Sequence, residues 1–246
     1  MLLLHIVAAT LLVGIISLTG VVLLVRRNDI HRLTIFFISL ASGSLLGGAF
    51  MHLIPESLEK KGPGALPIIG LGVFIFFVLE KFLIWRHCHV HQEHEHFERA
   101  TAARMVILSD AAHNFLDGAI IATSFSAGVP VGVSTTVAII LHEIPQELGD
   151  FAILVHGGFP VKRALLLNAA SAAFALVGAV LTYFFLDLAP AANAVLLPIT
   201  GGGFLYVALA DLIPQLHERS TLRQAAVQIL LVAAGFLSIG FLGHHH

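Results

Sequence analysis

Two stretches of the chain concentrate side chains that bind metal ions. The first carries Asp110, His113, Asn114 and Asp117, whose offsets of 0, 3, 4 and 7 place them on one helical face. The second carries His142, Glu143, Gln146, Glu147 and Asp150. Carboxylate, imidazole and amide groups together make a good divalent-cation site, and a bound cation offsets the desolvation of several acids at once. We therefore predict a metal site built from both stretches.

The segments that carry these residues are otherwise apolar. The chain of 246 residues is 57% apolar and 11% charged, with a mean hydropathy of +0.93, whereas a soluble domain has about a quarter charged residues. This composition argues against a water-soluble enzyme and against intrinsic disorder. There is no basic patch for nucleic acid, and the single cysteine excludes a disulfide framework within the chain.

Eight segments are long and apolar enough to span a bilayer, which takes about 20 residues. They are Leu2–Val25, Leu33–Ile54, Ala65–Trp85, Ala102–Ser126, Val131–Val155, Val161–Leu188, Ala194–Leu212 and Leu222–Leu242. We predict an all-α integral membrane protein, one domain over residues 1–246, with eight transmembrane helices. The metal site would lie between the fourth and fifth, facing a water-filled path because charges inside a bilayer are costly.

Pro145 interrupts the fifth segment. A proline inside a helix frees a backbone carbonyl one turn earlier, here near Leu141. Lipid cannot satisfy that carbonyl, whereas a cavity or a neighbouring helix can. We therefore predict a kinked helix that lines a cavity.

The basic residues fall almost entirely on one side of this arrangement. Of the 13 Lys and Arg residues, only Lys60 and Lys61 lie outside the odd-numbered loops and their flanks. Because Lys and Arg accumulate in cytoplasmic loops, we predict that the odd loops are cytoplasmic and that both termini lie outside. The short loops suit a bacterial inner membrane.

Two of the eight segments repeat each other. Gly43–Lys60 and Gly202–Arg219 are identical at seven of 18 aligned positions, including a Leu-Ile-Pro that follows His52 in one copy and Asp211 in the other. The copies run in opposite directions, which is typical of inverted-repeat transporters. We predict that helices 1–3 and 6–8 form an inverted repeat around helices 4 and 5. Candidates for the ion pathway, or for local structural roles, are His52, Asp110, Asp150 and Asp211.

Residues 86–100 form a predicted His-rich cytoplasmic loop between the third and fourth helices. Its candidate metal-capturing side chains are His87, Cys88, His89, His91, His94 and His96. Short His-rich tracts bind soft and borderline divalent metals, but the irregular spacing argues against a closed structural site. We predict a weak capture or sensing loop, with a passive solvated linker as the alternative.

The two metal-binding stretches resemble the paired motifs of Zrt/Irt-like (ZIP) metal transporters. They read HNFLDG at 113–118 and HEIPQELGD at 142–150, and the segments at 49–57 and 204–216 are similar to the second and seventh helices of that family. The resemblance covers essentially the whole chain and indicates a bacterial-type member. The nearest subfamily reads His-Glu-x-Pro-His-Glu-x-Gly-Asp in helix five, where this chain has Gln146 in place of the second histidine.

What the resemblance implies is a binuclear site. One metal would be held by His113, Asp117, His142 and Gln146, and the other by Asn114, Asp117, Glu143 and Gln146. Because glutamine is a neutral ligand through oxygen only, it would favour harder ions such as manganese or iron, with Glu147 as a substitute ligand if the helix rotates. The resemblance also implies a homodimer, and movement of helices one, four, five and six against the others.

These observations predict a transporter, not an enzyme, that moves a divalent metal into the cytoplasm by alternating access. Zinc is the foremost substrate, with iron, manganese and cadmium as further ones, and no catalytic cofactor is expected. An intramembrane zinc protease is an alternative because His142-Glu143 resembles the start of H-E-x-x-H, although Gln146 lacks the second imidazole. A metal sensor without transport is the other alternative.

Overall fold

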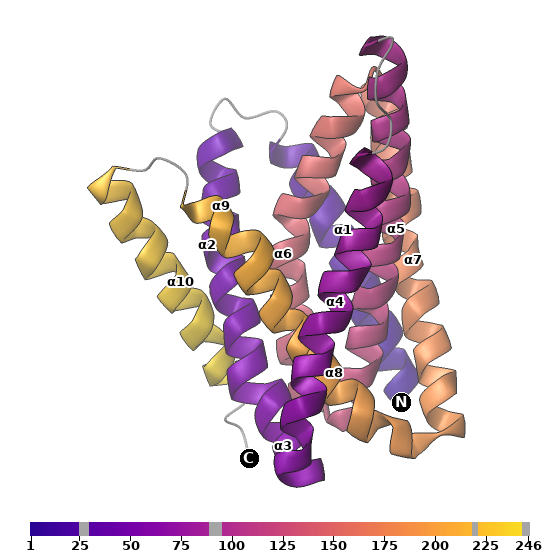
Figure 1. Ribbon diagram of the computed structural model, residues 1–246, viewed down its shortest axis with the longest axis vertical. Helices are drawn as coiled ribbons and strands as arrows, with labels where there is room; N and C mark the ends of the chain where they lie inside the picture. The colour runs from indigo at the N-terminus through magenta and orange to yellow at the C-terminus, as the bar shows by residue number, and fades with distance from the viewer. Residues whose placement is uncertain (25–29, 89–94, 218–220, 243–246) are drawn as a thin grey trace.

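The computed structural model describes residues 1–24, 30–88, 95–217 and 221–242, and gives no side-chain detail at 24, 30–32, 82–88, 95–105, 156 and 240–242. Almost all of the described residues are helical, with short turns between helices (Figure 1). The all-α prediction is therefore confirmed.

The long helices carry most of the chain. They are α1 (Leu2–Leu24), α2 (Ile30–Gly48), α4 (Ala65–Cys88), α5 (Glu95–Ala127), α6 (Val129–His156), α7 (Val161–Leu188), α8 (Asn193–Tyr206) and α10 (Leu222–Leu242). Shorter segments join them: η1 (Ala49–Leu53), α3 (Ile54–Lys61), η2 (Gly62–Gly64), η3 (Pro190–Ala192), η4 (Val207–Leu212) and α9 (Ile213–Leu216). The segments η1 and η4 are π-helices without a break on either side, so 30–61 and 193–216 are each one long helical unit.

The helical units run alternately up and down between two ends of the bundle (Figure 1). At one end lie the start of α1, the end of α10, and the α3–α4, α5–α6 and α7–α8 junctions. We call this the terminal end. The opposite end, where α1, α4, α6 and α9 lead into the next long helix, is called the loop end.

Five stretches of the described residues are long and apolar enough to cross a membrane. They are Leu2–Leu23, Leu33–Lys81, Val161–Leu188, Pro190–Leu216 and Leu222–Ile239. The second has 49 residues and contains a turn at Gly62, where φ is 63°, so it holds two antiparallel helices. Helices α5 and α6 are not among the five, because the polar residues of the two metal-binding stretches lower their hydropathy. The number of crossings stays a prediction.

Glycines set the closest contacts between the outer helices. On α2 and α10, and again on α4 and α8, a Cβ atom added to the glycine would meet a backbone carbonyl of the facing helix. These carbonyls belong to Val232 for Gly43, Leu40 for Gly235, Ile199 for Gly72 and Ile69 for Gly202. Small residues let helix backbones approach closely inside a membrane, so both pairs are tightly packed.

The larger apolar core extends from the terminal half of the bundle to the wall of the cavity described below. It joins α1, α2, η1, α5, α6, α7, α8, η4 and α10, and Leu45, Ile121, Leu197 and Ile239 in it are fully buried. A smaller core nearer the loop end joins α1, α6 and α7 around Val21 and Leu154. On α6 the members of the smaller core, such as Ile144 and Leu148, alternate along the chain with the polar residues of the metal-binding stretch.

Candidate metal site

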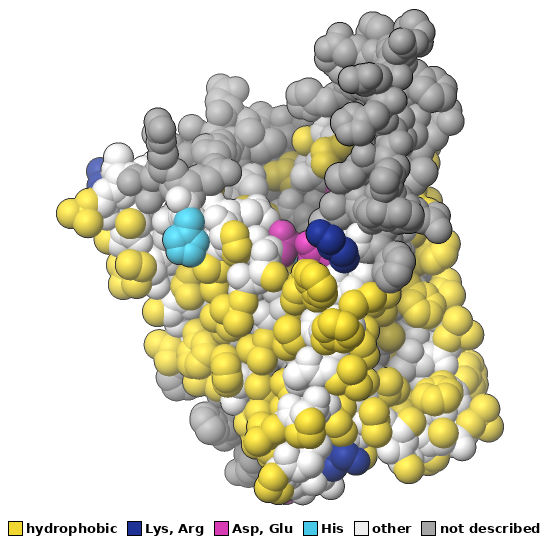
Figure 2. Space-filling model, in the orientation of Figure 1, with side chains coloured by type: hydrophobic (Ala, Val, Ile, Leu, Met, Phe, Trp, Pro, Cys, Tyr) yellow, Lys and Arg dark blue, Asp and Glu magenta, His cyan; other side chains and the backbone are white. Residues whose placement is uncertain are grey.

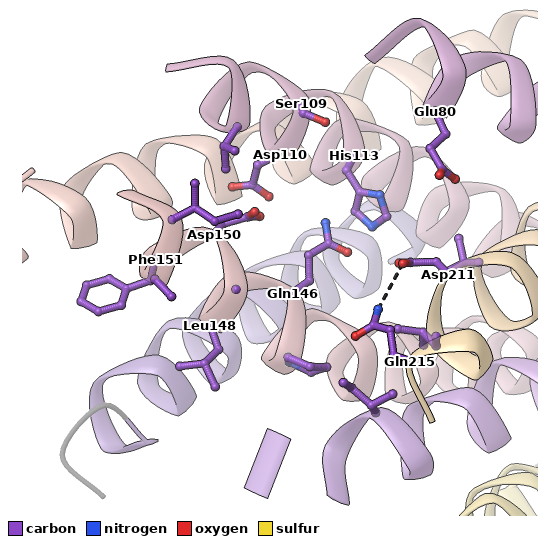
Figure 3. Close-up of a pocket in the computed structure, with 18 of the residues that line it drawn as sticks. Glu80, Ser109, Asp110, His113, Gln146, Leu148, Asp150, Phe151, Asp211 and Gln215 are labelled. Carbon is purple, nitrogen blue, oxygen red and sulfur yellow. Dashed lines mark hydrogen bonds between the residues drawn. The ribbon is translucent and has the colours of Figure 1, made fainter. Parts of the chain in front are cut away.

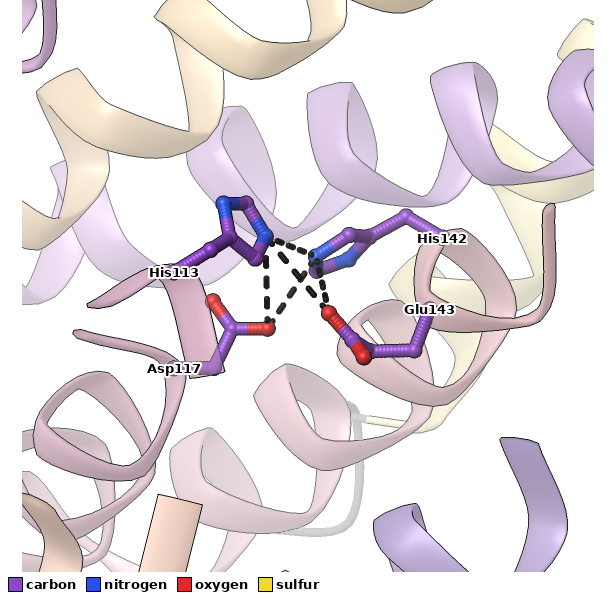
Figure 4. Close-up of side chains that lie close together, drawn as sticks. All are labelled: His113, Asp117, His142 and Glu143. Atoms are coloured by element: carbon purple, nitrogen blue, oxygen red, sulfur yellow. Dashed lines mark hydrogen bonds and ion pairs between the residues drawn. The ribbon is translucent and has the colours of Figure 1, made fainter. Parts of the chain in front are cut away.

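Four ligand side chains converge between α5 and α6 (Figure 4). The Nε2 atom of His142 lies 3.2 Å from Asp117 Oδ2, 3.4 Å from His113 Nε2 and 3.7 Å from Glu143 Oε1. The Nε2 atom of His113 lies 3.5 Å from Glu143 Oε1 and 3.8 Å from Asp117 Oδ2. In a tetrahedral site with metal–ligand bonds of about 2.0–2.1 Å, neighbouring ligand atoms are about 3.3 Å apart. Five of the six separations are therefore close to those that a tetrahedral zinc ion requires, and the sixth, between the two carboxylate oxygens, is within 4.8 Å.

The helices orient these ligands through their own backbone. His142 Nδ1 lies 3.2 Å from the carbonyl oxygen of Ala138, one turn earlier on α6. Because a carbonyl can only accept, Nδ1 carries the proton, and the lone pair of Nε2 points toward the other three ligands. Metal-binding histidines commonly donate their second ring nitrogen in this way.

The acids of the cluster are buried and lack hydrogen bonds. Asp117 Oδ2 and both carboxylate oxygens of Glu143 have no hydrogen-bond partner among the described residues. Asp117, His142 and Glu143 are all less than 4% exposed. Unpaired carboxylate oxygens are costly in a low-dielectric interior. A divalent cation at the centre of the cluster would satisfy them.

A cavity of about 840 Å³ leads from His113 toward the loop end (Figure 3). His113 is the only cluster member on its wall, and its side chain is 22% exposed, whereas the other three ligands lie behind it. Pro145 also lines this cavity, which confirms the prediction that its helix faces one; α6 continues through the proline without interruption.

The cavity is acidic. Its wall carries Glu80, Asp110, Asp150 and Asp211, and no Lys or Arg is present among the lining residues that the structure describes. Figure 2 shows acidic side chains in a hollow on this face, with apolar side chains over most of the surface below them. Walls of one charge sign raise the local concentration of counter-ions, so this cavity attracts cations to the cluster.

Asn114 lies outside the four-atom cluster, although it is on the predicted face of α5. Its Nδ2 donates to Asp110 Oδ1 at 2.8 Å and to the backbone carbonyl of Asp110 at 3.2 Å. Asp110 also accepts a hydrogen bond from the hydroxyl of Ser171 on α7. All three residues are at most 3% exposed. The Asp110 carboxylate therefore links the Asn114 side chain to α7 through two hydrogen bonds.

Gln146 and Glu147 also lie outside the cluster, on different sides of α6. Gln146 is half-buried and projects into the cavity, as do His113 and Asp211 (Figure 3). Glu147 is fully buried, and its carboxylate oxygens have no hydrogen-bond partner among the described residues. Its backbone carbonyl accepts a bond of 2.9 Å from Asn168 Nδ2 on α7.

The remaining predicted residues are distributed along the bundle. Asp150 lies half-buried on the cavity wall, and Asp211 is exposed there with Gln215 donating to it at 3.1 Å. His52 is buried near the terminal end, on η1. The predicted capture residues of the 86–100 segment fall outside the part of the chain whose side chains are described. At its two ends the backbone is helical, because α4 reaches Cys88 and α5 begins at Glu95.

Several polar residues of the site and cavity were not singled out from the sequence. Asn168 and Ser171 are buried on α7 and bond to the metal-site helices, and Glu80 and Gln215 line the cavity. Asn168 and Ser171 are three residues apart inside an apolar segment, which puts them on one helical face and was the signal that could have found them.

The chain is similar to zinc transporters of eukaryotes. Residues 84–243 match the family described as ZIP zinc transporter. The chain is 31% identical to the zinc transporter YKE4 of Saccharomyces cerevisiae, over 89% of this chain and 74% of that protein. It is 34% identical to the zinc transporter ZIP13 of Pongo abelii, over 81% of this chain and 64% of that protein. It is 32% identical to the zinc transporter ZIP4 of Mus musculus, over 84% of this chain and 42% of that protein.

Proposed function

Because the chain belongs to the ZIP zinc transporter family, we propose that it carries zinc through the cluster of His113, Asp117, His142 and Glu143 by alternating access. The observation that supports this most strongly is a buried, zinc-sized group of four ligand atoms at the closed end of an acidic cavity. One end of the path is open to water and the other is filled by the apolar core. A substrate site that is open to one side and closed to the other is what an alternating-access carrier has in each of its two states.

The family consists of transporters and not of enzymes, so the protease alternative is wrong. The geometry agrees with this assignment. In H-E-x-x-H proteases the glutamate is a general base and not a zinc ligand, whereas Glu143 Oε1 is one of the four clustered ligand atoms. The sensor alternative is disfavoured by the deep position of the cluster at the end of a cavity.

We propose eight crossings arranged as an inverted repeat of 1–3 and 6–8. Both repeat copies contain a π-helix directly before the shared Ile-Pro, η1 with His52 and η4 with Asp211. The glycine contacts are also similar in the two copies. Gly43 and Gly202, which are aligned in the repeat, each face a backbone carbonyl of the neighbouring helix, on α10 and on α4 respectively, and this supports the repeat.

We propose that the loop end faces the cytoplasm. The helix ends that the odd-numbered loops connect lie at this end, and those loops with their flanks carry all the Lys and Arg residues of the sequence apart from Lys60 and Lys61. The cavity then opens inward, and the direction of transport is toward the cytoplasm. The prediction of a bacterial inner membrane rests on loop length alone and stays a prediction.

We propose that α1, α5, α6 and α7 move together against the other helices. A Cβ atom on Gly118 of α5 would meet the carbonyl of Ala175 on α7, and one on Gly178 would meet that of Phe115. The Ser171–Asp110 and Asn168–Glu147 hydrogen bonds add polar links from α7 to α5 and α6. The glycine-packed pairs α2–α10 and α4–α8 would form the static part. The homodimer stays a prediction.

We propose that the cluster holds one zinc ion at a time. Two imidazoles and two carboxylates suit zinc, and they also accept iron, manganese and cadmium. Gln146 is the ligand that an ion meets between the cluster and the cavity, because it projects into the same space as His113. Asn114 and Glu147 remain proposed ligands of a second ion, supported by the unpaired carboxylate of Glu147.

The test is metal flux into proteoliposomes that contain the purified chain. We expect zinc uptake that saturates with rising zinc concentration and is inhibited by cadmium, iron and manganese. Saturation follows from a carrier that binds one ion per cycle, whereas a pore would show flux that keeps rising with the gradient. Absence of zinc flux, with the protein folded and inserted, would overturn the proposed function.

A further inference from the structure

Two buried hydroxyls between the cluster and the terminal end have no hydrogen bond. Ser124 on α5 and Thr135 on α6 are both 0% exposed, and neither hydroxyl has a partner among the described residues. Serine and threonine in membrane helices usually bond to a carbonyl of their own helix. The neighbouring residues do this: Thr123, Ser126, Ser134 and Thr136 each donate to a carbonyl three or four residues earlier.

These two hydroxyls lie on the same helical faces as the metal ligands. Ser124 follows Asp117 by seven residues on α5, and Thr135 precedes His142 by seven residues on α6. Seven residues are close to two turns, so each pair shares a face. The two helices are antiparallel, and both steps lead toward the terminal end. The unpaired hydroxyls therefore continue the line of the cluster on the side away from the cavity.

His52 reaches the same depth from a third helix. A Cβ atom added to Gly48 of α2 would lie 3.8 Å from the Cβ of Ala138 on α6, so these two positions are level. His52 is four residues beyond Gly48, and Thr135 is three residues before Ala138, in each case about one turn toward the terminal end. His52 and Thr135 are thus near the same level of the bundle.

The imidazole of His52 is oriented like that of a metal ligand. Its Nε2 lies 2.9 Å from the carbonyl oxygen of Ile239, in the last turn of α10. The carbonyl only accepts, so Nε2 carries the proton and Nδ1 keeps its lone pair. His142 in the cluster has the same arrangement with the two nitrogens exchanged.

The repeat gives His52 a counterpart in the open half of the molecule. Asp211 is the aligned residue, on the π-helix η4, and it lines the acidic cavity. His52, on the π-helix η1, is 9% exposed and directly precedes Leu53 of the larger apolar core. The two equivalent positions therefore carry side chains that can bind metal, one beside the open cavity and one in the closed half.

We propose that His52, Ser124 and Thr135 form an outer contact for the divalent cation, which the ion meets before it reaches the four-residue cluster. This outer contact is closed in the present conformation and opens when the cavity at the loop end closes. The inference rests on the proposed function and extends it to the entry side of the path. His52 remains fixed on the glycine-packed α2–α10 pair, while Ser124 and Thr135 move with α5 and α6.

The first experiment removes the hydroxyls without changing the packing much. The double variant Ser124→Ala/Thr135→Val should raise the KM for zinc uptake about fivefold, because capture from outside loses two oxygen contacts. Zinc binding to the cluster, measured by calorimetry on the purified protein, should not change. The matched control is Ser126→Ala/Thr136→Val, which removes two hydroxyls that bond to their own helices, and its KM should stay within about twofold of the wild type.

The second experiment changes the chemistry of the histidine. In a Cys88→Ser background, His52→Cys should raise the ratio of cadmium flux to zinc flux about fivefold, because thiolate prefers the softer ion. A residue that only capped α10 would lower both fluxes equally and leave their ratio unchanged. The control is His5→Cys in the same background, which alters an exposed histidine near the start of α1.

The outcomes separate the two proposals. Normal zinc flux in the wild type, with an unshifted KM in the hydroxyl double variant and an unchanged metal ratio in His52→Cys, would overturn the outer contact alone. Zinc flux that is absent from the wild type would overturn the proposed function and the outer contact with it.

Discussion

The two halves of the proposed ion path differ in both polarity and packing. On the loop side of the cluster, a cavity of about 840 Å³ is lined by four acids and reaches His113. On the terminal side, the larger apolar core fills the space with residues such as Leu53, Ile121 and Phe204, which are at most 2% exposed. Among the residues that the structure describes, the cluster is therefore reached by a cavity from the loop end, while apolar side chains fill the terminal side.

In the proposed repeat the two halves differ in access more than in the side chains they offer. At equivalent positions, Asp211 lines the open cavity, whereas His52 is buried and bonds to the Ile239 carbonyl. What differs is whether apolar side chains fill the space around each residue. A transporter of this design changes which half is packed, while the ligands of the cluster stay between the same two helices.

The largest effect is expected at the cluster itself. His142→Ala or Asp117→Ala should lower zinc uptake into proteoliposomes about 100-fold or more, because each removes one of four ligands of a buried cation. The melting temperature of the Asp117 variant in detergent should be retained, since this substitution also removes a buried carboxylate oxygen that has no hydrogen bond among the described residues.

The control for these variants is Asp187→Ala, which removes an exposed acid near the terminal end of α7. It should transport zinc at the wild-type rate. Wild-type uptake by both cluster variants would contradict the assigned site and remove the basis of the comparison between the two halves.

Glycine substitutions test how differently the two halves are packed. A Cβ atom on Gly48, in the closed half, would lie 3.1 Å from a ring carbon of Phe204, so Gly48→Ala should destabilise the protein by about 1–2 kcal/mol. Gly149 lines the cavity with nothing within 4 Å of an added Cβ, and Gly149→Ala should be neutral or stabilising by up to about 1 kcal/mol. Thermal unfolding in detergent measures both, and equal shifts would mean that the halves are packed alike.

Gln146 lies at the boundary between the cluster and the open half. Gln146→His should tighten zinc binding about tenfold, or about 1.4 kcal/mol, because a neutral oxygen ligand is replaced by imidazole. When zinc and manganese compete for uptake, the ratio of zinc flux to manganese flux should also rise. The control Gln215→His places the same group farther out in the cavity, and its zinc affinity should change less than about twofold. If zinc affinity rose equally in both variants, a histidine anywhere in the cavity would suffice, and position 146 would have no special role.

The smallest effect is expected in the acidic cavity. Asp211→Asn should lower zinc flux about two- to threefold at low ionic strength, because it removes one of four carboxylates that attract cations. The deficit should shrink in 0.5 M salt, where charges are screened over a few ångströms. Glu59→Gln, an exposed acid at the terminal end, is the control. A deficit that is independent of salt would show that Asp211 acts by direct contact.

Much of the fold followed from the sequence because its signals are local. The predicted helices 161–188 and 222–242 match α7 and α10 to the residue. Their ends are marked by glycine, proline and charge, which act within a few residues of the chain. The predicted helix 131–155 lies within two residues of α6 at each end, whereas 102–126 begins seven residues after the start of α5, because the polar first turns of that helix lie outside the apolar run.

The π-helices and the glycine contacts could not be predicted from local sequence signals. The repeated Leu-Ile-Pro motif indicated that 43–60 and 202–219 correspond, but no local pattern shows that η1 and η4 carry an extra residue per turn. Gly43 and Gly70 look alike in sequence. Only the packing shows that one faces a backbone carbonyl and the other has nothing within 4 Å.

The sequence by itself determined which side chains could bind a metal and which helical faces they share, because helical periodicity is a property of a single segment. It did not determine which of them meet. Tertiary structure brought His142 and Glu143 of α6 to His113 and Asp117 of α5, bonded Asp110 to Ser171 of α7, and left Glu147 outside the four-atom cluster. It also decided which half of the path is open, because that depends on how eight helical units pack and not on any one of them.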